Sequence, residues 1–180
     1  MNEPPSPTRP AEPRIEVTVD DEQSDHAIDA PRWARLAEFV LAAEGIAHGE
    51  LALTFVDEAT IAELNHEHMG ADGPTDVLAF PLDADLSNDE ASATDQPLLL
   101  GDVVICPAVA ARNAPDHASD PHPGHPDHRG TLDDELTLLV VHGVLHVLGM
   151  DHAEPEETAA MHAAERTIIA AFDPDAEVVR

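Results

Sequence analysis

The sequence contains no lysine, so all of its basic side chains apart from histidine are arginines. Its 8 arginines face 37 acidic residues, which gives a formal net charge of -29 at pH 7. A field of this sign repels polyanions and attracts cations, and without lysine a broad basic platform for phosphates is excluded. A salt-rich cytoplasm and a codon bias against lysine would each explain the composition. The one basic patch that the sequence permits is a narrow cluster of Arg32, Arg35 and Arg112.

Cysteine and long apolar runs are also scarce. The single cysteine, Cys106, excludes an internal disulfide, and its apolar surroundings (VVICP) predict a buried thiol. The sequence has no run of 18 apolar residues, and its N-terminus is acidic and proline-rich where a signal peptide would be basic and then apolar. These features predict a soluble, cytoplasmic protein with no membrane partner.

The chain has the length of one domain, and 43% hydrophobic residues are enough for one core. We expect a single domain over residues 15–172, preceded by a disordered, proline-rich tail over 1–14 and followed by a C-terminal tail over 173–180. Two segments without apolar periodicity, about 83–97 and 114–130, are expected to be loop insertions.

The second insertion is rich in histidine. Flexible tracts of this kind bind metals only loosely, so a disordered, solvated loop over 115–130 is favoured over a second metal site. Its histidines are His117, His122, His125 and His128.

Hydrophobic periodicity predicts strands and helices that alternate along most of the chain. The pattern favours an α/β or α+β layer fold with a central sheet of about four strands. Strands are expected near residues 15–19, 50–56, 76–82 and 98–107, and helices near 31–44, 57–65, 107–114, 132–148 and 154–172.

The densest chemical motif is HGVLHVLGMDH at the end of the most apolar predicted helix. His142 and His146 are four residues apart, which places them on one helical face at chelating distance. Gly149 allows the chain to leave the helix through a left-handed turn, so that His152 can return as a third ligand. Three imidazoles would leave one open position on a tetrahedral metal, as in catalytic sites. The alternative, three ordinary core histidines, would leave buried imidazoles without partners.

Other residues near this motif are ambiguous. Asp151 is a candidate catalytic residue that could orient an imidazole or shuttle a proton, or it could only tighten the turn. Thr75 and Asp76 could line the cleft or only close a turn before a strand. Gly143 stands where the protease motif H-E-x-x-H has its glutamate base, which argues against a peptidase.

The run H-G-x-L-H-x-x-G-x-D-H resembles the YbeY family of bacterial endoribonucleases. The segments PTDVLAF at 74–80 and LGDVVIC at 100–106 are similar to two further family motifs in the same order, and the resemblance covers about residues 15–172. It implies an α+β fold with a mixed sheet, and metal binding by His142, His146 and His152.

For function, the resemblance implies a metal-dependent, single-strand endoribonuclease that hydrolyses phosphodiester bonds. Its expected cofactor is one divalent metal ion per chain, with zinc as the favoured ion. Its expected role is maturation of the 3′ end of 16S ribosomal RNA and ribosome quality control, with ribosomal RNA and the small ribosomal subunit as partners. Two alternatives remain at this point: an assembly factor with a structural metal, and a metal-dependent hydrolase of a non-RNA substrate.

The sequence departs from the family at one functional position. Many members have an arginine shortly before the PTDV segment, and Met69 stands there in this chain. Arg32, Arg35 or Arg112 could replace that arginine.

Overall fold

The computed structural model describes residues 14–82 and 98–175. The predicted tail over 1–14 (apart from Arg14), the insertion at 83–97 and residues 176–180 of the predicted C-terminal tail lie outside these residues. Within the described part of the chain, no helix is long and apolar enough to cross a membrane.

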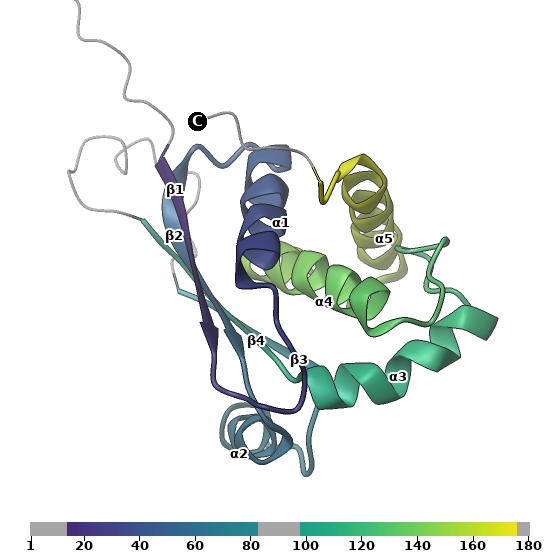
Figure 1. Ribbon diagram of the computed structural model, residues 1–180. Helices are drawn as coiled ribbons and strands as arrows, with labels where there is room; N and C mark the ends of the chain where they lie inside the picture. Colours follow the sequence, from purple (N-terminus) through teal and green to yellow (C-terminus); the bar gives the residue numbers. More distant parts are fainter. Residues whose placement is uncertain (1–13, 83–97, 176–180) are drawn as a thin grey trace, which may run out of the picture.

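The described residues form a four-stranded mixed sheet, which confirms the predicted fold class (Figure 1). Its strands lie in the order β1-β2-β4-β3. The first three of these are mutually parallel, and β3 runs antiparallel to β4. The strands are β1 (Arg14–Asp21), β2 (His48–Phe55), β3 (Val77–Pro81) and β4 (Leu99–Ile105).

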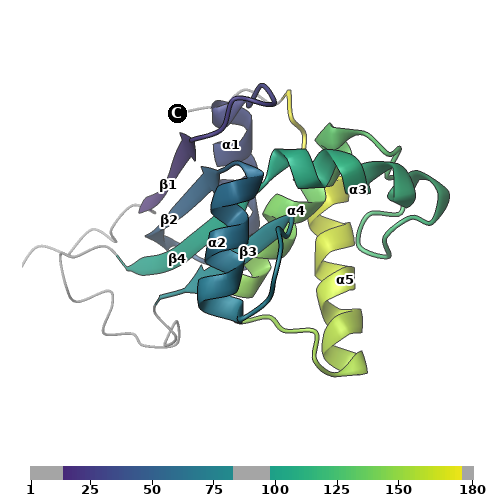
Figure 2. The same cartoon turned by 90° about the horizontal axis from the view of Figure 1, so that it is seen from below.

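The described residues also form five helices, which are distributed unequally around the sheet. α1 and α4 pack on one face with α5 behind α4, and α2 lies on the other face (Figures 1 and 2). The helices are α1 (Ala30–Ala43), α2 (Glu58–Met69), α3 (Pro107–Ser119), α4 (Leu132–Val147) and α5 (Pro155–Ala171).

Side chains of β4 alternate between the two cores because successive residues of a strand point to opposite faces. Val103 and Ile105 belong to the larger core under α1 and α4. Val104 and the residue after the strand, Cys106, belong to a smaller core with Ile61 of α2. Cys106 is fully buried, as predicted, and this burial raises the pKa of its thiol.

The start of α4 is held by a compact hydrogen-bond network. The hydroxyl of Thr131 caps the helix by accepting the backbone N–H of Asp134, and it also donates to the Asp134 carboxylate. Arg129 donates to that carboxylate from its guanidinium and its backbone N–H. Burial alone would raise the pKa of Asp134, but hydrogen bonds from Arg129 and Thr131 outweigh it and lower the pKa to about 2.

Two helices are longer than predicted. α2 continues beyond Asn65 to Met69, where Gly70 ends it in the left-handed conformation. α3 continues through Pro115 to Ser119, although proline usually ends a helix.

The prediction of a disordered insertion over 115–130 is wrong. The first part belongs to α3, and His125 and His128 are only 7% and 4% exposed. The physical reason lies in distant residues: the segment packs against buried carboxylates of α4 and α5, and no local sequence pattern announces those partners.

Gly143 permits the close contact between α4 and the sheet. A Cβ atom at this position would lie 2.5 Å from Cγ1 of Val103, which is shorter than any normal carbon contact. We therefore predict that Gly143→Ala lowers the free energy of unfolding by about 1 to 3 kcal/mol, although alanine is the better helix former. Urea denaturation would measure this.

A Val103→Ala background is the control, because removing the valine methyl groups should relieve most of the added cost of Gly143→Ala. A Gly143→Ala protein as stable as the wild type would contradict this packing.

Candidate metal centre

Two imidazoles face each other near the C-terminal end of α4. His142 and His146 lie one helical turn apart on the same face. Their Nε2 atoms are 3.1 Å apart, and the two rings are nearly perpendicular, with an interplanar angle of 82°. Both Nε2 atoms are therefore directed at a common point.

The turn after α4 brings the third histidine to the same place. Gly149 has a φ of 88°, its N–H donates to the carbonyl of His146, and the N–H of Met150 donates to that of Leu145. This is a Schellman motif, in which glycine takes the left-handed position. The chain reverses there, and one ring nitrogen each of His142, His146 and His152 lies within 4.8 Å of the others.

A buried carboxylate from α5 orients the first histidine. Oε1 of Glu165 lies 2.8 Å from Nδ1 of His142, and the Glu165 side chain is fully buried. The Nδ1–H group donates to this carboxylate, so the lone pair of Nε2 faces the other two imidazoles. Carboxylates commonly orient metal-binding histidines in this way.

Sequence reasoning missed Glu165. A signal existed, because Glu165 lies within the buried stripe Met161, Glu165 and Ile168 of α5, where an apolar residue would be expected.

The donor atoms fit a divalent metal ion. Burial lowers the pKa of His146, and the neighbouring His142 and His152 lower it further, so this imidazole is neutral at pH 7 and keeps its lone pair. Three imidazoles, one of them oriented by a carboxylate, are a suitable ligand set for zinc.

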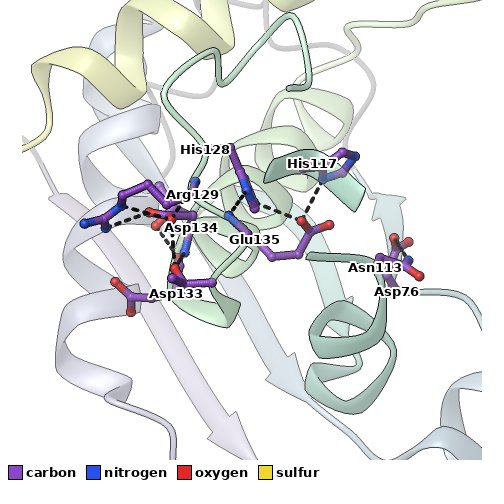
Figure 3. Close-up of polar contacts among 11 residues, drawn as sticks. Asp76, Asn113, His117, His128, Arg129, Asp133, Asp134 and Glu135 are labelled. Carbon is purple, nitrogen blue, oxygen red and sulfur yellow. Dashed lines mark hydrogen bonds and ion pairs between the residues drawn. The ribbon is translucent and has the colours of Figure 1, made fainter. Parts of the chain in front are cut away.

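The three histidines lie in a cleft of about 570 Å³. The opposite wall comes from β3 and the loop before it and includes Thr75, Asp76 and Leu78. Asp76 is held in place, because its carboxylate accepts a hydrogen bond from the side-chain amide of Asn113 at 3.0 Å (Figure 3). Its backbone carbonyl accepts from Cys106 at the end of β4.

A family model described as Endoribonuclease YbeY matches residues 18–173 of this chain. The chain belongs to the YbeY family. The Endoribonuclease YbeY of Salinispora tropica is 48% identical over 127 residues, which cover 68% of this chain and 74% of that protein. The one from Thermobifida fusca is 42% identical over 80% of this chain and 86% of its own length.

A solved structure shows the same fold. The solution structure of TM1509 from Thermotoga maritima is similar with a TM-score of 0.51 and 24% sequence identity, and the match covers 87% of each chain.

The packing of α4 on the sheet explains why position 143 of this YbeY family member is a glycine. Its missing side chain is directed at Val103 of the sheet, and the Cβ atom of a glutamate there would clash with that valine. A base of the kind found in H-E-x-x-H proteases therefore has no room at this position.

Asp151 lines the cleft beside His152. One of its carboxylate oxygens accepts the backbone N–H of His152 at 2.7 Å, which tightens the turn. The side chain is exposed, so a second role toward a substrate stays a prediction.

The expected cluster of Arg32, Arg35 and Arg112 does not form at the cleft. Arg32 makes a bidentate pair with Asp133, Arg35 donates to the carbonyl of Pro174, and Arg112 makes a bidentate pair with Glu58. Among the described residues, no arginine lines the cleft. Met69 does line it and is 53% exposed, so a methionine occupies this part of the wall.

If Glu165 orients His142 for a metal, replacing it should weaken metal binding. We predict that Glu165→Leu raises the Kd for Zn²⁺ by about 10 to 100-fold, and that Glu165→Gln, which keeps a hydrogen-bond acceptor, raises it less. Competition with a chromophoric chelator would measure both values. Glu156→Leu at an exposed position of the same helix is the matched control. Equal affinities for Glu165→Leu and the control would contradict the orienting role.

Proposed function

We propose that this protein is a metal-dependent endoribonuclease that hydrolyses phosphodiester bonds in single-stranded ribosomal RNA. The observation that carries the proposal is the set of three converging imidazoles, one of them oriented by Glu165, that lines an open cleft. The Salinispora tropica and Thermobifida fusca relatives, both called Endoribonuclease YbeY, support it. We further propose that it acts in the cytoplasm on ribosomal RNA of the small subunit, including the 3′ end of 16S RNA, and contributes to ribosome quality control.

In this proposal His142, His146 and His152 hold one divalent ion, with zinc favoured by the nitrogen ligands. Such an ion polarises a phosphoryl oxygen and activates water at neutral pH. Glu165 holds His142 in the tautomer that leaves Nε2 available.

Two carboxylates that line the cleft have separate proposed roles. Asp151, next to His152, is placed to accept a proton during attack on the phosphate. Asp76 lies on the wall opposite the histidines and is held by Asn113. Its proposed role is to accept a hydrogen bond from a substrate hydroxyl.

The shape of the cleft suits an unpaired strand. Met69, Pro81 and Met150 provide apolar surface against which an unstacked base can pack, and the metal provides the positive charge for the phosphate. A regular duplex, with both backbones exposed to a surface of net charge -29, would be repelled more strongly than one strand.

The first test replaces a metal ligand. We predict that His146→Asn loses the metal bound at the cleft. Its cleavage rate on a single-stranded ribosomal RNA fragment should fall by at least about 100-fold. Metal content would be counted by mass spectrometry on the same samples. His48→Asn, at an exposed position of β2, is the control and should behave as wild type.

Loss of metal with unchanged RNA cleavage would contradict the proposed mechanism. Metal bound to the wild type without cleavage of any RNA would instead favour an assembly factor or a hydrolase of another substrate.

The charge of the chain predicts an unusual salt dependence. Nucleic-acid-binding proteins with six to ten phosphate contacts lose roughly 10³ to 10⁵ in affinity between about 50 and 200 mM salt. Because no arginine of the described residues lines this cleft, we predict that RNA affinity changes by less than about 10-fold over this range or rises as salt screens the repulsion. Fluorescence anisotropy with a labelled RNA would measure it. A steep loss of affinity would show that RNA contacts a basic surface outside the cleft.

A further inference from the structure

A second group of metal-ligand side chains lies near the other end of α4. Glu135, in the first turn of α4, is seven residues before His142, or about 10 Å along the helix axis. One of its oxygens, Oε2, lies 2.8 Å from Nδ1 of His117 in the last turn of α3. The same oxygen lies 3.0 Å from Nε2 of His128 in the loop before α4 (Figure 3). Three elements that are separate in the chain therefore converge on one point.

These side chains are shielded from water to an unusual degree. The side chains of His128 and Glu135 are 0% and 1% exposed, and that of His117 is 28% exposed. A carboxylate in such a place is costly unless a positive charge compensates it. Among the described residues, the arginines nearest along the chain do not supply this charge, because Arg129 pairs with Asp134 and Arg112 pairs with Glu58.

The contact between His128 and Glu135 is short without being a hydrogen bond. Nε2 of His128 is buried and has no hydrogen-bond partner among the described residues, although Oε2 of Glu135 lies 3.0 Å away. The ring N–H direction misses the oxygen, so the two atoms converge as neighbours around a common centre.

We propose that His117, His128 and Glu135 bind a second divalent transition-metal ion, of which zinc is the best match. Two imidazoles and one carboxylate form a known zinc ligand set, and the nitrogen donors disfavour calcium and magnesium. The ion joins α3, α4 and the loop between them. This inference does not depend on the proposed nuclease activity.

Ion binding requires a change of tautomer in both imidazoles. In the structure, Nδ1 of His128 accepts the N–H of Gly130 at 3.0 Å, which assigns the ring proton to Nε2. With an ion on Nε2 the proton moves to Nδ1, and the N–H of Gly130, a partly exposed residue, turns to water. In His117 the proton moves from Nδ1 to Nε2. The cost is the loss of the Gly130 contact and of the hydrogen bond from His117 to Glu135, both replaced by metal ligation.

The neighbouring cluster of His122, His162 and Glu165 is the weaker candidate. Glu165 already accepts from His142, and Gly124 lies so close that a Cβ there would be 1.9 Å from the other carboxylate oxygen. This backbone leaves little room for an ion. The contact between Gly124 and Glu165 also shows what the second ion would achieve. That ion would anchor the loop that carries His128, and the same loop covers Glu165.

Metal stoichiometry of the full chain tests the proposal. Protein stripped by a chelator is titrated with Zn²⁺ in the presence of a competing chelator that removes weakly held ions, and bound zinc is counted by mass spectrometry. We expect two ions per chain in the wild type and one in either His117→Asn or His128→Asn. His125→Asn, from the same loop but outside the ligand set, is the matched control and should retain two.

Circular dichroism identifies variants that fail to fold, and His117→Asn, at the partly exposed ligand, is the variant expected to tolerate substitution best. One ion in the wild type, lost in His146→Asn and kept in His117→Asn and His128→Asn, overturns the second site and leaves the first intact. Two ions in folded His117→Asn and His128→Asn also overturn it, because the second ion then lies elsewhere. If the wild type binds no ion tightly, the proposed function is overturned together with the second site. Failure of the second site alone and failure of the proposed function therefore give different results.

Discussion

The hydrogen bond between Glu165 and His142 is the interaction on which the site depends. It joins α5 to α4, fixes the tautomer of one imidazole and directs its Nε2 atom toward His146 and His152. The carboxylate is fully buried, so its desolvation is compensated only if partners remain in place. α5 packs across α4 at this point, and the loop around Gly124 closes against the same carboxylate. The ligand geometry is a result of tertiary packing as well as of the histidine motif.

The contact between α4 and the sheet provides the second constraint. Gly143 lets the helix approach β4 so closely that no side chain fits between them. The same contact places the histidines opposite Thr75 and Asp76, and a cleft forms between the end of α4 and the antiparallel edge strand β3. A glycine in place of the protease glutamate is therefore both a packing requirement and a chemical difference, because any proton acceptor must come from another element.

The sequence predicted the features that depend on neighbouring residues. Strand alternation and the histidine spacing are local, and the sheet, the core position of Cys106 and the left-handed turn at Gly149 agree with the structure. Features that depend on distant partners were missed or wrong. Glu165 and Glu135 acquire their roles only when α5, α3 and the histidine-rich loop meet α4, and the loop is ordered by those carboxylates. The three arginines expected to form one patch have separate acceptors instead: Arg32 and Arg112 each pair with a carboxylate of this acidic chain, and Arg35 donates to a backbone carbonyl.

The central claim, that His142, His146 and His152 bind a divalent metal, can be tested by X-ray diffraction from crystals of the zinc-loaded protein at the zinc absorption edge. The account predicts an anomalous peak about 2.0 to 2.1 Å from one nitrogen of each of the three imidazoles, with Glu165 still bonded to the far side of His142. An anomalous map with no peak among these three histidines, from crystals soaked in excess zinc, would contradict it.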